Sequence, residues 1–265
     1  MPVRDTELYV KAEGNGPPLA FVHGMCGDAE VWTDQVRRLS DRFTCLAYDR
    51  RGHSRSPAGA RDQSYATHAD DAAALIETLG LRGCTLVGSS GGAYVGFEVL
   101  RRHPGVVGAA VLSEPPLFPL DPAAGAALKR DVAPAVDAAV ASRGPRAAVD
   151  AFFEVVCPGL WEAIDERRRD RYRDNAPMLL PALTEPADPV DAATLAAIDV
   201  PVLVLTGSES HPALRTIAAR LASGLINASL VELPGSGHVT YAEQPAAFEA
   251  AVRAFADSLG PRPRG

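Results

Sequence analysis

A glycine-flanked serine is the side chain of this protein with the clearest chemical potential. Ser90 lies at the centre of Gly88-Ser89-Ser90-Gly91-Gly92, between an apolar run that predicts a buried strand (84–87) and a helical segment (93–102). Glycines on both sides allow strand and helix to approach closely at a sharp turn whose central residue is strained. Such a turn holds the serine hydroxyl in the open above the helix N-terminus, so Ser90 is a candidate nucleophile.

A serine hydroxyl is a poor nucleophile near neutral pH and needs a neighbouring base. His238 ends the run Gly235-Ser236-Gly237-His238, which follows a strand-like segment (229–233) and precedes the last helical segment (245–258). The pKa of histidine suits both proton removal from the serine and proton return to the leaving group. His238 is therefore the candidate base, and His23 is expected to shape a loop.

The segments that must position these residues alternate between strand and helix. Six continuous apolar runs predict buried strands, and a short antiparallel opening precedes them at 3–13; the six runs cover 19–22, 43–48, 84–87, 107–112, 200–206 and 229–233. Helical spacing of apolar residues predicts helices between them, at 30–39, 67–79, 93–102, 212–223 and 245–258. Continuous apolar strands alternating with helices indicate an α/β fold, with a mostly parallel sheet covered on both faces.

The alternation stops between about 120 and 190, where only helical patterns occur, at 123–141, 145–156 and 160–174. An all-helical block inside an α/β chain predicts an inserted cap above the carboxyl ends of the strands, where open sheets bind ligands. The expected division is a core of residues 1–116 and 192–259, a helical cap of residues 117–191 and a disordered tail of residues 260–265.

Four fragments in order together resemble the α/β-hydrolase fold superfamily across nearly the whole chain. They are His23-Gly24 after an early strand, the segment 49–56 after the next, the turn at Ser90, and Gly235-Ser236-Gly237-His238 after the last strand. The resemblance implies that the backbone N–H groups of Met25 and Gly91 form an oxyanion hole, with the Met25 side chain facing the acyl pocket. It also implies that Asp49 and Arg51 tie loops together without taking part in chemistry.

The acid is where the chain departs from the family pattern. Members commonly carry Gly-x-x-Asp after the strand before the last, but this chain reads Gly207-Ser208-Glu209-Ser210. Glu209, one residue early, is one replacement. Glu114 is the preferred one, because it ends the 107–112 strand, at the location from which certain dehalogenases and the zearalenone lactonases supply the acid. A carboxylate directly after a buried strand must be paired to be tolerated there.

Serine at the turn favours acyl chemistry over reactions that need a carboxylate nucleophile. Ser89-Ser90-Gly91 with an acid at Glu114 is similar to the zearalenone-type lactonases. We expect hydrolysis of a small apolar carboxylic ester or lactone through a Ser-His-Glu triad and an acyl-enzyme. Three alternatives stay open: a C–C bond hydrolase, a cofactor-free lyase or cyclase using His238 as base, and a hydrolase-like receptor that binds a small ligand with little turnover.

Apolar residues near the predicted cap are candidates to line the substrate pocket, although an apolar stripe at helical spacing is more often a helix's own core. The candidates are Met25, Leu117, Phe118, Phe153, Trp161, Met178 and Val239, and Phe152, Val156 and Leu179 share their setting.

Composition limits the other possibilities. The chain has 265 residues and a net charge of −7, and its one dense basic cluster, Glu166-Arg167-Arg168-Arg169-Asp170-Arg171, predicts a solvated helix face, so nucleic acid is not an expected partner. No signal peptide and no run of ~20 apolar residues is present, so a cytoplasmic protein without a membrane partner is expected. The four cysteines are far apart and no metal motif occurs, so neither a metal nor a cofactor is expected. The oligomeric expectation is a monomer or a homodimer.

Overall fold

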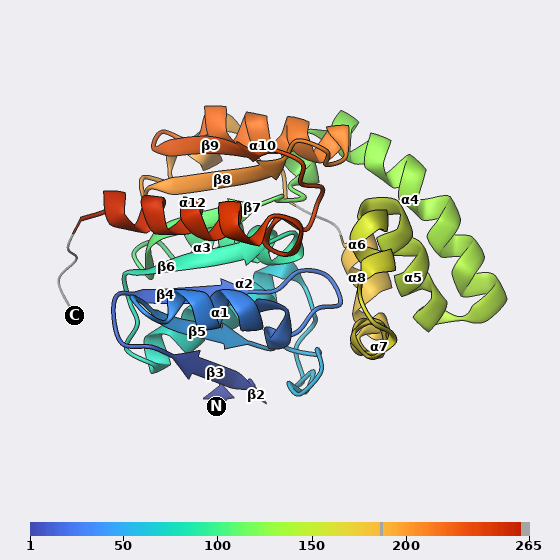
Figure 1. Cartoon of the computed structure of the whole chain (residues 1–265), viewed down its shortest axis with the longest axis horizontal. Helices are drawn as coiled ribbons and strands as arrows, with labels where there is room; N and C mark the ends of the chain where they lie inside the picture. Colours follow the sequence, from blue (N-terminus) through green and yellow to red (C-terminus); the bar gives the residue numbers. More distant parts are fainter. Residues whose placement is uncertain (186–187, 261–265) are drawn as a thin grey trace.

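A seven-stranded sheet forms the centre of the molecule (Figure 1). The computed structural model of the chain describes residues 1–185 and 188–260. The strand order is β3-β5-β4-β6-β7-β8-β9; β3 pairs with β5 antiparallel and all other neighbours are parallel. The strands are β3 (Val10–Glu13), β4 (Pro18–Val22), β5 (Thr44–Tyr48), β6 (Cys84–Ser89), β7 (Val107–Ser113), β8 (Val202–Gly207) and β9 (Ala228–Leu233), preceded by a separate pair, β1 (Pro2–Val3) and β2 (Thr6–Glu7). The predicted mostly parallel sheet is thus confirmed.

Side chains of the strands alternate between two buried faces. Phe21 of β4 and Val87 of β6 belong to one apolar cluster, whereas their neighbours Val22 and Leu86 belong to the other. This alternation follows from the two-residue period of an extended strand. Because both faces are apolar, helices must cover both.

Helices from distant parts of the chain supply the two covers. The first cluster contains residues of α1 (Thr33–Leu39) and α12 (Pro245–Ser258). The second contains residues of α2 (Tyr65–Thr78), α3 (Gly91–Arg102) and α10 (Pro212–Gly224). The chain is therefore an α/β protein with helices on both sides of its sheet, as expected.

A block of helices lies between β7 and β8 in the chain, and the arrowheads of the parallel strands point towards it (Figure 1). It contains η2 (Phe118–Leu120), α4 (Pro122–Arg143), α5 (Pro145–Val156), α6 (Pro158–Ala163), α7 (Glu166–Asp174), η3 (Ala176–Met178) and α8 (Leu179–Thr184), and α9 (Ala192–Ala196) follows. Proline is the first residue of α4, α5 and α6, where its missing N–H is not needed. We call the segment 117–185 the cap; the domain boundaries given above stay a prediction, and most of the predicted disordered tail (261–265) lies outside the described residues.

Several local expectations were wrong. The helix predicted over 160–174 is two helices, because Ile164 is extended and the Asp165 carboxylate accepts the Arg168 N–H at 2.8 Å as a new N-cap. The helix predicted over 30–39 begins as a 3₁₀ turn, η1 (Ala29–Trp32). The short helix α11 (Thr240–Glu243), directly after His238, was missed.

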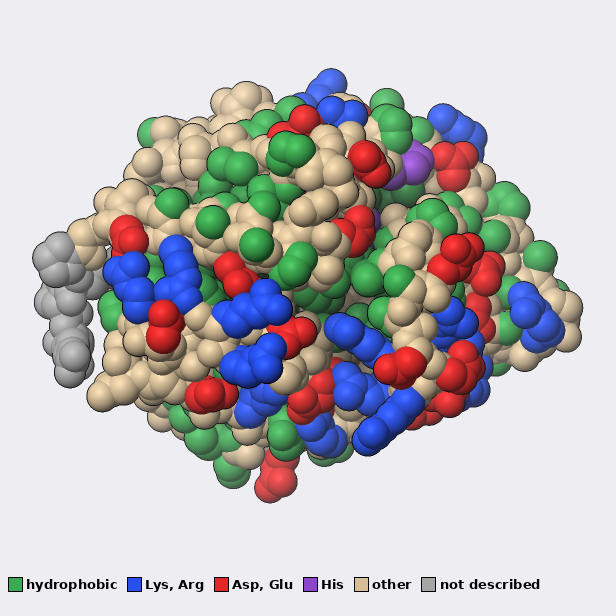
Figure 2. Space-filling view, in the orientation of Figure 1, with side chains coloured by type: hydrophobic (Ala, Val, Ile, Leu, Met, Phe, Trp, Pro, Cys, Tyr) green, Lys and Arg blue, Asp and Glu red, His purple; other side chains and the backbone are tan. Residues whose placement is uncertain are grey.

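The arginine-rich helix α7 is more than a solvated face. Figure 2 shows acidic and basic side chains interspersed on the face drawn, including the region of the cap. Arg173 pairs with Asp150 of α5 at 2.8 Å, and Arg171 pairs with Asp28, before η1, at 3.2 Å. Helix α7 therefore joins the cap to the loop that follows β4.

The four cysteines, all in the described residues, are buried and form no disulfide with one another. Within residues 1–185 and 188–260, no helix is both long and apolar enough to cross a bilayer.

A fully buried arginine ties the loop after β5 to the rest of the core, as expected. Arg51, with no exposed side-chain surface, donates to Asp71 of α2 at 2.6 and 2.9 Å and to Asp5 at 2.8 Å. The exposed Arg61 also pairs with Asp5, at 3.0 Å.

Replacing Arg51 by alanine is expected to lower the free energy of unfolding by about 3–5 kcal/mol, because the buried Asp71 carboxylate loses its main counter-ion. Urea unfolding followed by circular dichroism measures this. Arg61→Ala is the matched control and is expected to leave the midpoint almost unchanged. Equal shifts in the two variants would contradict the role given to Arg51.

Candidate functional site

The turn at Ser90 is as sharp as its glycines predict. Ser90 joins β6 to α3 with a φ of 54° and a ψ of −124°, a strained conformation for a residue with a side chain. A Cβ on Gly88 would lie 2.3 Å from the Gly92 carbonyl oxygen, and a Cβ on Gly92 would lie 2.1 Å from the Val22 carbonyl oxygen. Both positions therefore require glycine. The Ser90 N–H donates to the Ser113 carbonyl at 2.8 Å, which fixes the turn against β7.

His238 reaches this turn from the loop between β9 and α11. Its imidazole is buried, and Nε2 lies 2.9 Å from the Ser90 hydroxyl oxygen. The carboxylate of Glu243, in α11, accepts the N–H groups of Gly237 and Val239 at 2.5 and 3.0 Å. The backbone is therefore clamped on both sides of His238. The sequence analysis did not identify Glu243 as a functional residue. The available signal was a carboxylate only five residues after the candidate base His238.

The Glu114 carboxylate is the partner of the other imidazole nitrogen. It lies at the end of β7 with no exposed surface and a φ of 54°. Its oxygens accept hydrogen bonds from His238 Nδ1 at 3.1 Å, the Thr206 hydroxyl at 2.6 Å, the Gly207 N–H at 2.8 Å and the Ser210 hydroxyl at 2.5 Å. Four donors compensate a carboxylate that would otherwise be too costly to bury.

The alternative acid does not enter this arrangement. Glu209 has an exposed side chain, and its backbone N–H donates to the Ser236 carbonyl at 2.8 Å. Ser210, which stands where the family pattern has aspartate, instead points its hydroxyl at Glu114. Of the two candidate acids, the structure brings only Glu114 to His238. The sequence analysis did not predict that Ser210 and Thr206 bind the Glu114 carboxylate. The available signal was the serine at position 210, where the family commonly has the acid.

Ser90, His238 and Glu114 thus form one continuous chain of hydrogen bonds. An imidazole held by a carboxylate on Nδ1 presents Nε2 as an acceptor to the serine hydroxyl. Such an arrangement can remove the hydroxyl proton as the oxygen attacks an electrophilic carbon, and it can stabilise the imidazolium that results.

Two backbone donors lie beside Ser90. In the described residues, neither the Met25 N–H nor the Gly91 N–H donates a hydrogen bond. The two groups are close together, since a Cβ on Gly91 would lie 3.5 Å from the Met25 nitrogen. A Cβ on Gly24 would lie 3.2 Å from the Ser90 Cβ, so the loop after β4 touches the turn itself. Converging free donors of this kind can stabilise an oxyanion.

A cap residue holds the loop that carries Met25. Asn175, between α7 and η3, is buried and donates to the carbonyls of Cys26 and Gly27 at 2.9 and 3.0 Å. Its carbonyl oxygen accepts the Ser54 N–H at 2.7 Å. Cys26 and Ser54 both have a positive φ, so the amide of Asn175 spans two strained loops. No local pattern marks Asn175, and sequence reasoning missed it.

Buried histidines support the same loop from the core side. His23 Nδ1 donates to the Gly24 carbonyl at 3.0 Å, and Nε2 accepts the Arg50 N–H at 2.9 Å, so His23 shapes the loop as expected. Burial, and then the positive charge of Arg50, hold the pKa values of His23, His53 and His68 well below the ordinary value. The three imidazoles are therefore neutral near pH 7.

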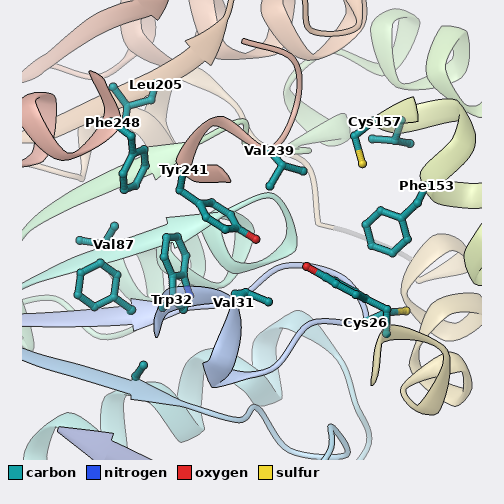
Figure 3. Close-up of a cluster of buried hydrophobic side chains, with 14 of the residues drawn as sticks. Cys26, Val31, Trp32, Val87, Phe153, Cys157, Leu205, Val239, Tyr241 and Phe248 are labelled. Carbon is teal, nitrogen blue, oxygen red and sulfur yellow. The ribbon is translucent and has the colours of Figure 1, made fainter. Parts of the chain in front are cut away.

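The candidate pocket residues fall into two groups. Met25 and Met178 line a cavity between core and cap, together with Arg50 and Tyr65. The others are mostly buried in apolar clusters. Phe153 stacks on Trp161 with ring centroids 4.7 Å apart, and Figure 3 shows Phe153 and Cys157 on one side of a buried apolar cluster, with Val239 and Tyr241 on the other. Leu117 has no exposed surface, and the partly buried Phe118 packs beside Gly125. A role of these residues in substrate binding stays a prediction.

Among the residues that the structure describes, no group of three or more histidine, cysteine, aspartate or glutamate side chains could hold a metal ion.

Comparison with known proteins gives a consistent result. The model of the alpha/beta hydrolase family matches residues 19–251. The uncharacterized hydrolase YraK of Bacillus subtilis is 35% identical over 120 residues, and this match spans only 44% of each chain. The 2-(acetamidomethylene)succinate hydrolase of Mesorhizobium japonicum is 29% identical over 95% of this chain and 92% of its own. The crystal structure of the esterase RhEst1 from Rhodococcus superimposes with a TM-score of 0.80 and 25% identity, covering 98% of this chain and 100% of that one.

Replacing Asn175 by alanine is expected to lower the free energy of unfolding by about 2–3 kcal/mol, because two carbonyls and one N–H lose a buried partner. Chemical denaturation followed by tryptophan fluorescence measures the loss. Asp174→Ala, a change at the exposed neighbouring residue, is the control and is expected to shift stability by at most about 0.5 kcal/mol. If both variants were equally stable, Asn175 would not be the link between cap and loop.

Proposed function

The chain belongs to the alpha/beta hydrolase family and is a hydrolase, and we propose that it cleaves a carboxylic ester or lactone through an acyl-enzyme formed on Ser90. The observation that carries this proposal is the bridging position of His238, 2.9 Å from the Ser90 oxygen and 3.1 Å from the Glu114 carboxylate. Serine, base and acid come from three different loops, and their side chains nevertheless meet in the order that acyl transfer needs.

In the first half of the reaction, the Ser90 oxygen attacks the ester carbon while its proton passes to His238 Nε2. The carbonyl oxygen becomes an oxyanion, and the N–H groups of Met25 and Gly91 are the donors in position to bind it. His238 then gives the proton to the departing alkoxide, which leaves as an alcohol, and the acyl group stays on Ser90. In a lactone the alcohol remains attached to the acyl group.

In the second half, water replaces the alcohol. His238 takes a proton from the water as its oxygen attacks the acyl carbon, and returns that proton to Ser90 as the carboxylic acid leaves. Glu114 keeps Nδ1 protonated and stabilises the imidazolium in both halves. The Thr206 and Ser210 hydroxyls and the Gly207 N–H hold the carboxylate in place against the imidazole.

Replacing Ser90 by alanine is expected to lower kcat for 4-nitrophenyl butyrate by roughly 10⁴-fold or more, because the nucleophile is lost. Release of 4-nitrophenol under multiple-turnover conditions measures this. Ser89→Ala, one residue earlier in β6, is the matched control and is expected to keep most of the activity.

Activity that survives in the Ser90→Ala variant would point instead to a reaction in which His238 acts directly as the base. Stoichiometric binding without turnover in the unaltered protein would point to a receptor. Either result would contradict the proposed acyl-enzyme.

Replacing Glu114 by glutamine is expected to lower kcat by about 10⁴-fold, since an amide neither holds the correct imidazole tautomer nor stabilises the imidazolium. Glu209→Gln is the control for the same chemical change, and it is expected to be nearly silent because its side chain is exposed. Circular dichroism spectra and melting curves of both variants show whether the protein is still folded. A larger loss in Glu209→Gln than in Glu114→Gln would overturn the assignment of the acid.

A further inference from the structure

Arg50 is a buried cation without an anionic partner. Only 4% of its surface is exposed, and among the described residues no carboxylate oxygen lies within 4.0 Å of its guanidinium. Its neighbours in the same segment differ, because Arg51 pairs with Asp71 and Asp5, and Arg55 pairs with Asp49 and Glu30. An unpaired buried charge is costly, so its presence calls for a physical explanation.

The partners that Arg50 does have are neutral. Its Nη2 donates to the Gly24 carbonyl at 3.0 Å and to His53 Nε2 at 3.3 Å. His53 accepts at Nε2 because its Nδ1 donates to the Arg51 carbonyl at 3.0 Å. The Arg50 Nε–H has no partner. Burial lowers the pKa of Arg50, but a guanidinium stays protonated in proteins, so the charge is not lost.

The side chain lines a small cavity next to the proposed oxyanion hole. The cavity measures about 10 Å³, which is room for about one water molecule. Met25 also lines it, and so does Tyr65, whose hydroxyl oxygen would lie 3.3 Å from a Cβ on Gly91. A group bound in this cavity would therefore lie close to Met25 and Gly91, whose N–H groups are the proposed oxyanion donors.

Other polar atoms in the same cavity are also unsatisfied. Gln63 Oε1 and His68 Nδ1 are buried without a hydrogen-bond partner, and both residues line the cavity with Arg50. Unpaired buried polar atoms are uncommon in folded proteins. The Arg50 Nε–H requires a hydrogen-bond acceptor, whereas the Gln63 amide oxygen requires a donor, so an acceptor bound in this cavity would satisfy Arg50 and leave Gln63 without a partner.

Glu185 of the cap also lines the cavity, and its carboxylate opposes the positive charge of Arg50 there. Its two oxygens accept the Tyr65 N–H at 2.9 and 3.2 Å, and burial raises its pKa. No ion pair within 4.0 Å joins it to Arg50 among the described residues, but the two charges attract each other across the cavity. Its charge disfavours an anion in the cavity, whereas the charge of Arg50 favours one.

We propose that Arg50 forms a carboxylate subsite, so that the preferred substrates are esters or lactones that carry a second, free carboxylate. This rests on the proposed function and narrows its substrate class. A carboxylate is a monoanion that can accept the unused Nε–H in a short charge-assisted hydrogen bond. Because a carboxylate is larger than water, its binding requires an outward shift of cap residues on the cavity wall, among them Met178 and Ala182.

The kinetic test compares two 4-nitrophenyl esters of similar length, one with a free carboxylate (4-nitrophenyl hydrogen glutarate) and one without (4-nitrophenyl pentanoate). The unaltered protein is expected to prefer the glutarate ester in kcat/KM. Arg50→Gln is expected to lower this preference about 10- to 100-fold, mostly through KM for the glutarate ester. Glu185→Gln is expected to raise it, and Arg61→Gln, a change at an exposed arginine, to leave it unchanged.

The ratio of the two substrates separates a subsite from a purely structural role. If Arg50 only holds the Gly24 carbonyl, Arg50→Gln lowers activity on both esters by the same factor and the preference stays, which overturns the proposal. Arg50→Lys, which keeps the charge, is expected to retain part of the preference.

A binding experiment tests the subsite without requiring catalysis and without requiring that an Arg50 variant folds. Isothermal titration calorimetry of the Ser90→Ala protein with monomethyl glutarate and with dimethyl glutarate is expected to show at least tenfold tighter binding of the acid. Equal binding overturns the carboxylate subsite. If no ester were turned over but the acid still bound selectively, the proposed ester hydrolysis would be wrong and the carboxylate subsite would still be supported.

Discussion

The site depends on the need to satisfy one buried carboxylate. Glu114 has no contact with solvent, and its backbone is held in the left-handed region at the end of β7. Its oxygens can be stabilised there only by donors from the neighbouring segments, namely Thr206 and Gly207 of β8, Ser210 of the next loop, and His238. The carboxylate thus fixes the ends of two strands and the histidine loop relative to one another. That constraint sets the position from which His238 meets Ser90.

A second constraint comes from the strand order. The chain leaves β4 for β5 on one side and returns to β6 on the other, so the loops after β4 and β6 diverge from adjacent strands. Open sheets bind ligands at such a switch point. The loop after β4 carries Met25 and is held twice, by His23 and Arg50 from the core and by Asn175 from the cap. The cap therefore helps to shape the site that it covers.

The sequence was informative where a property is local. Glycine at 88 is required by a contact of 2.3 Å within the turn itself, and the strand and helix patterns follow from burial of successive side chains. Glycine at 92 is required by the adjacent strand β4, because a Cβ there would lie 2.1 Å from the Val22 carbonyl oxygen. Local expectations were wrong where a polar group interrupted an apolar pattern, as at Asp165, which starts a new helix inside the predicted one. Contacts between distant segments produce no local pattern in the sequence. The residues that flank Asn175 and Glu243 in the chain do not indicate which backbone groups these two side chains bind.

The choice between Glu114 and Glu209 shows the same division most clearly. The sequence by itself determined the α/β architecture, the strained serine turn and the glycine-rich loop of His238, because steric and apolar patterns within about ten residues specify them. Only the tertiary structure decided which carboxylate reaches His238, because that depends on a hydrogen bond between residues 124 positions apart. It also decided that Arg50 has no carboxylate partner among the described residues while Arg51 and Arg55 have one, since the sequence around an arginine carries no information about which distant carboxylates fold against it.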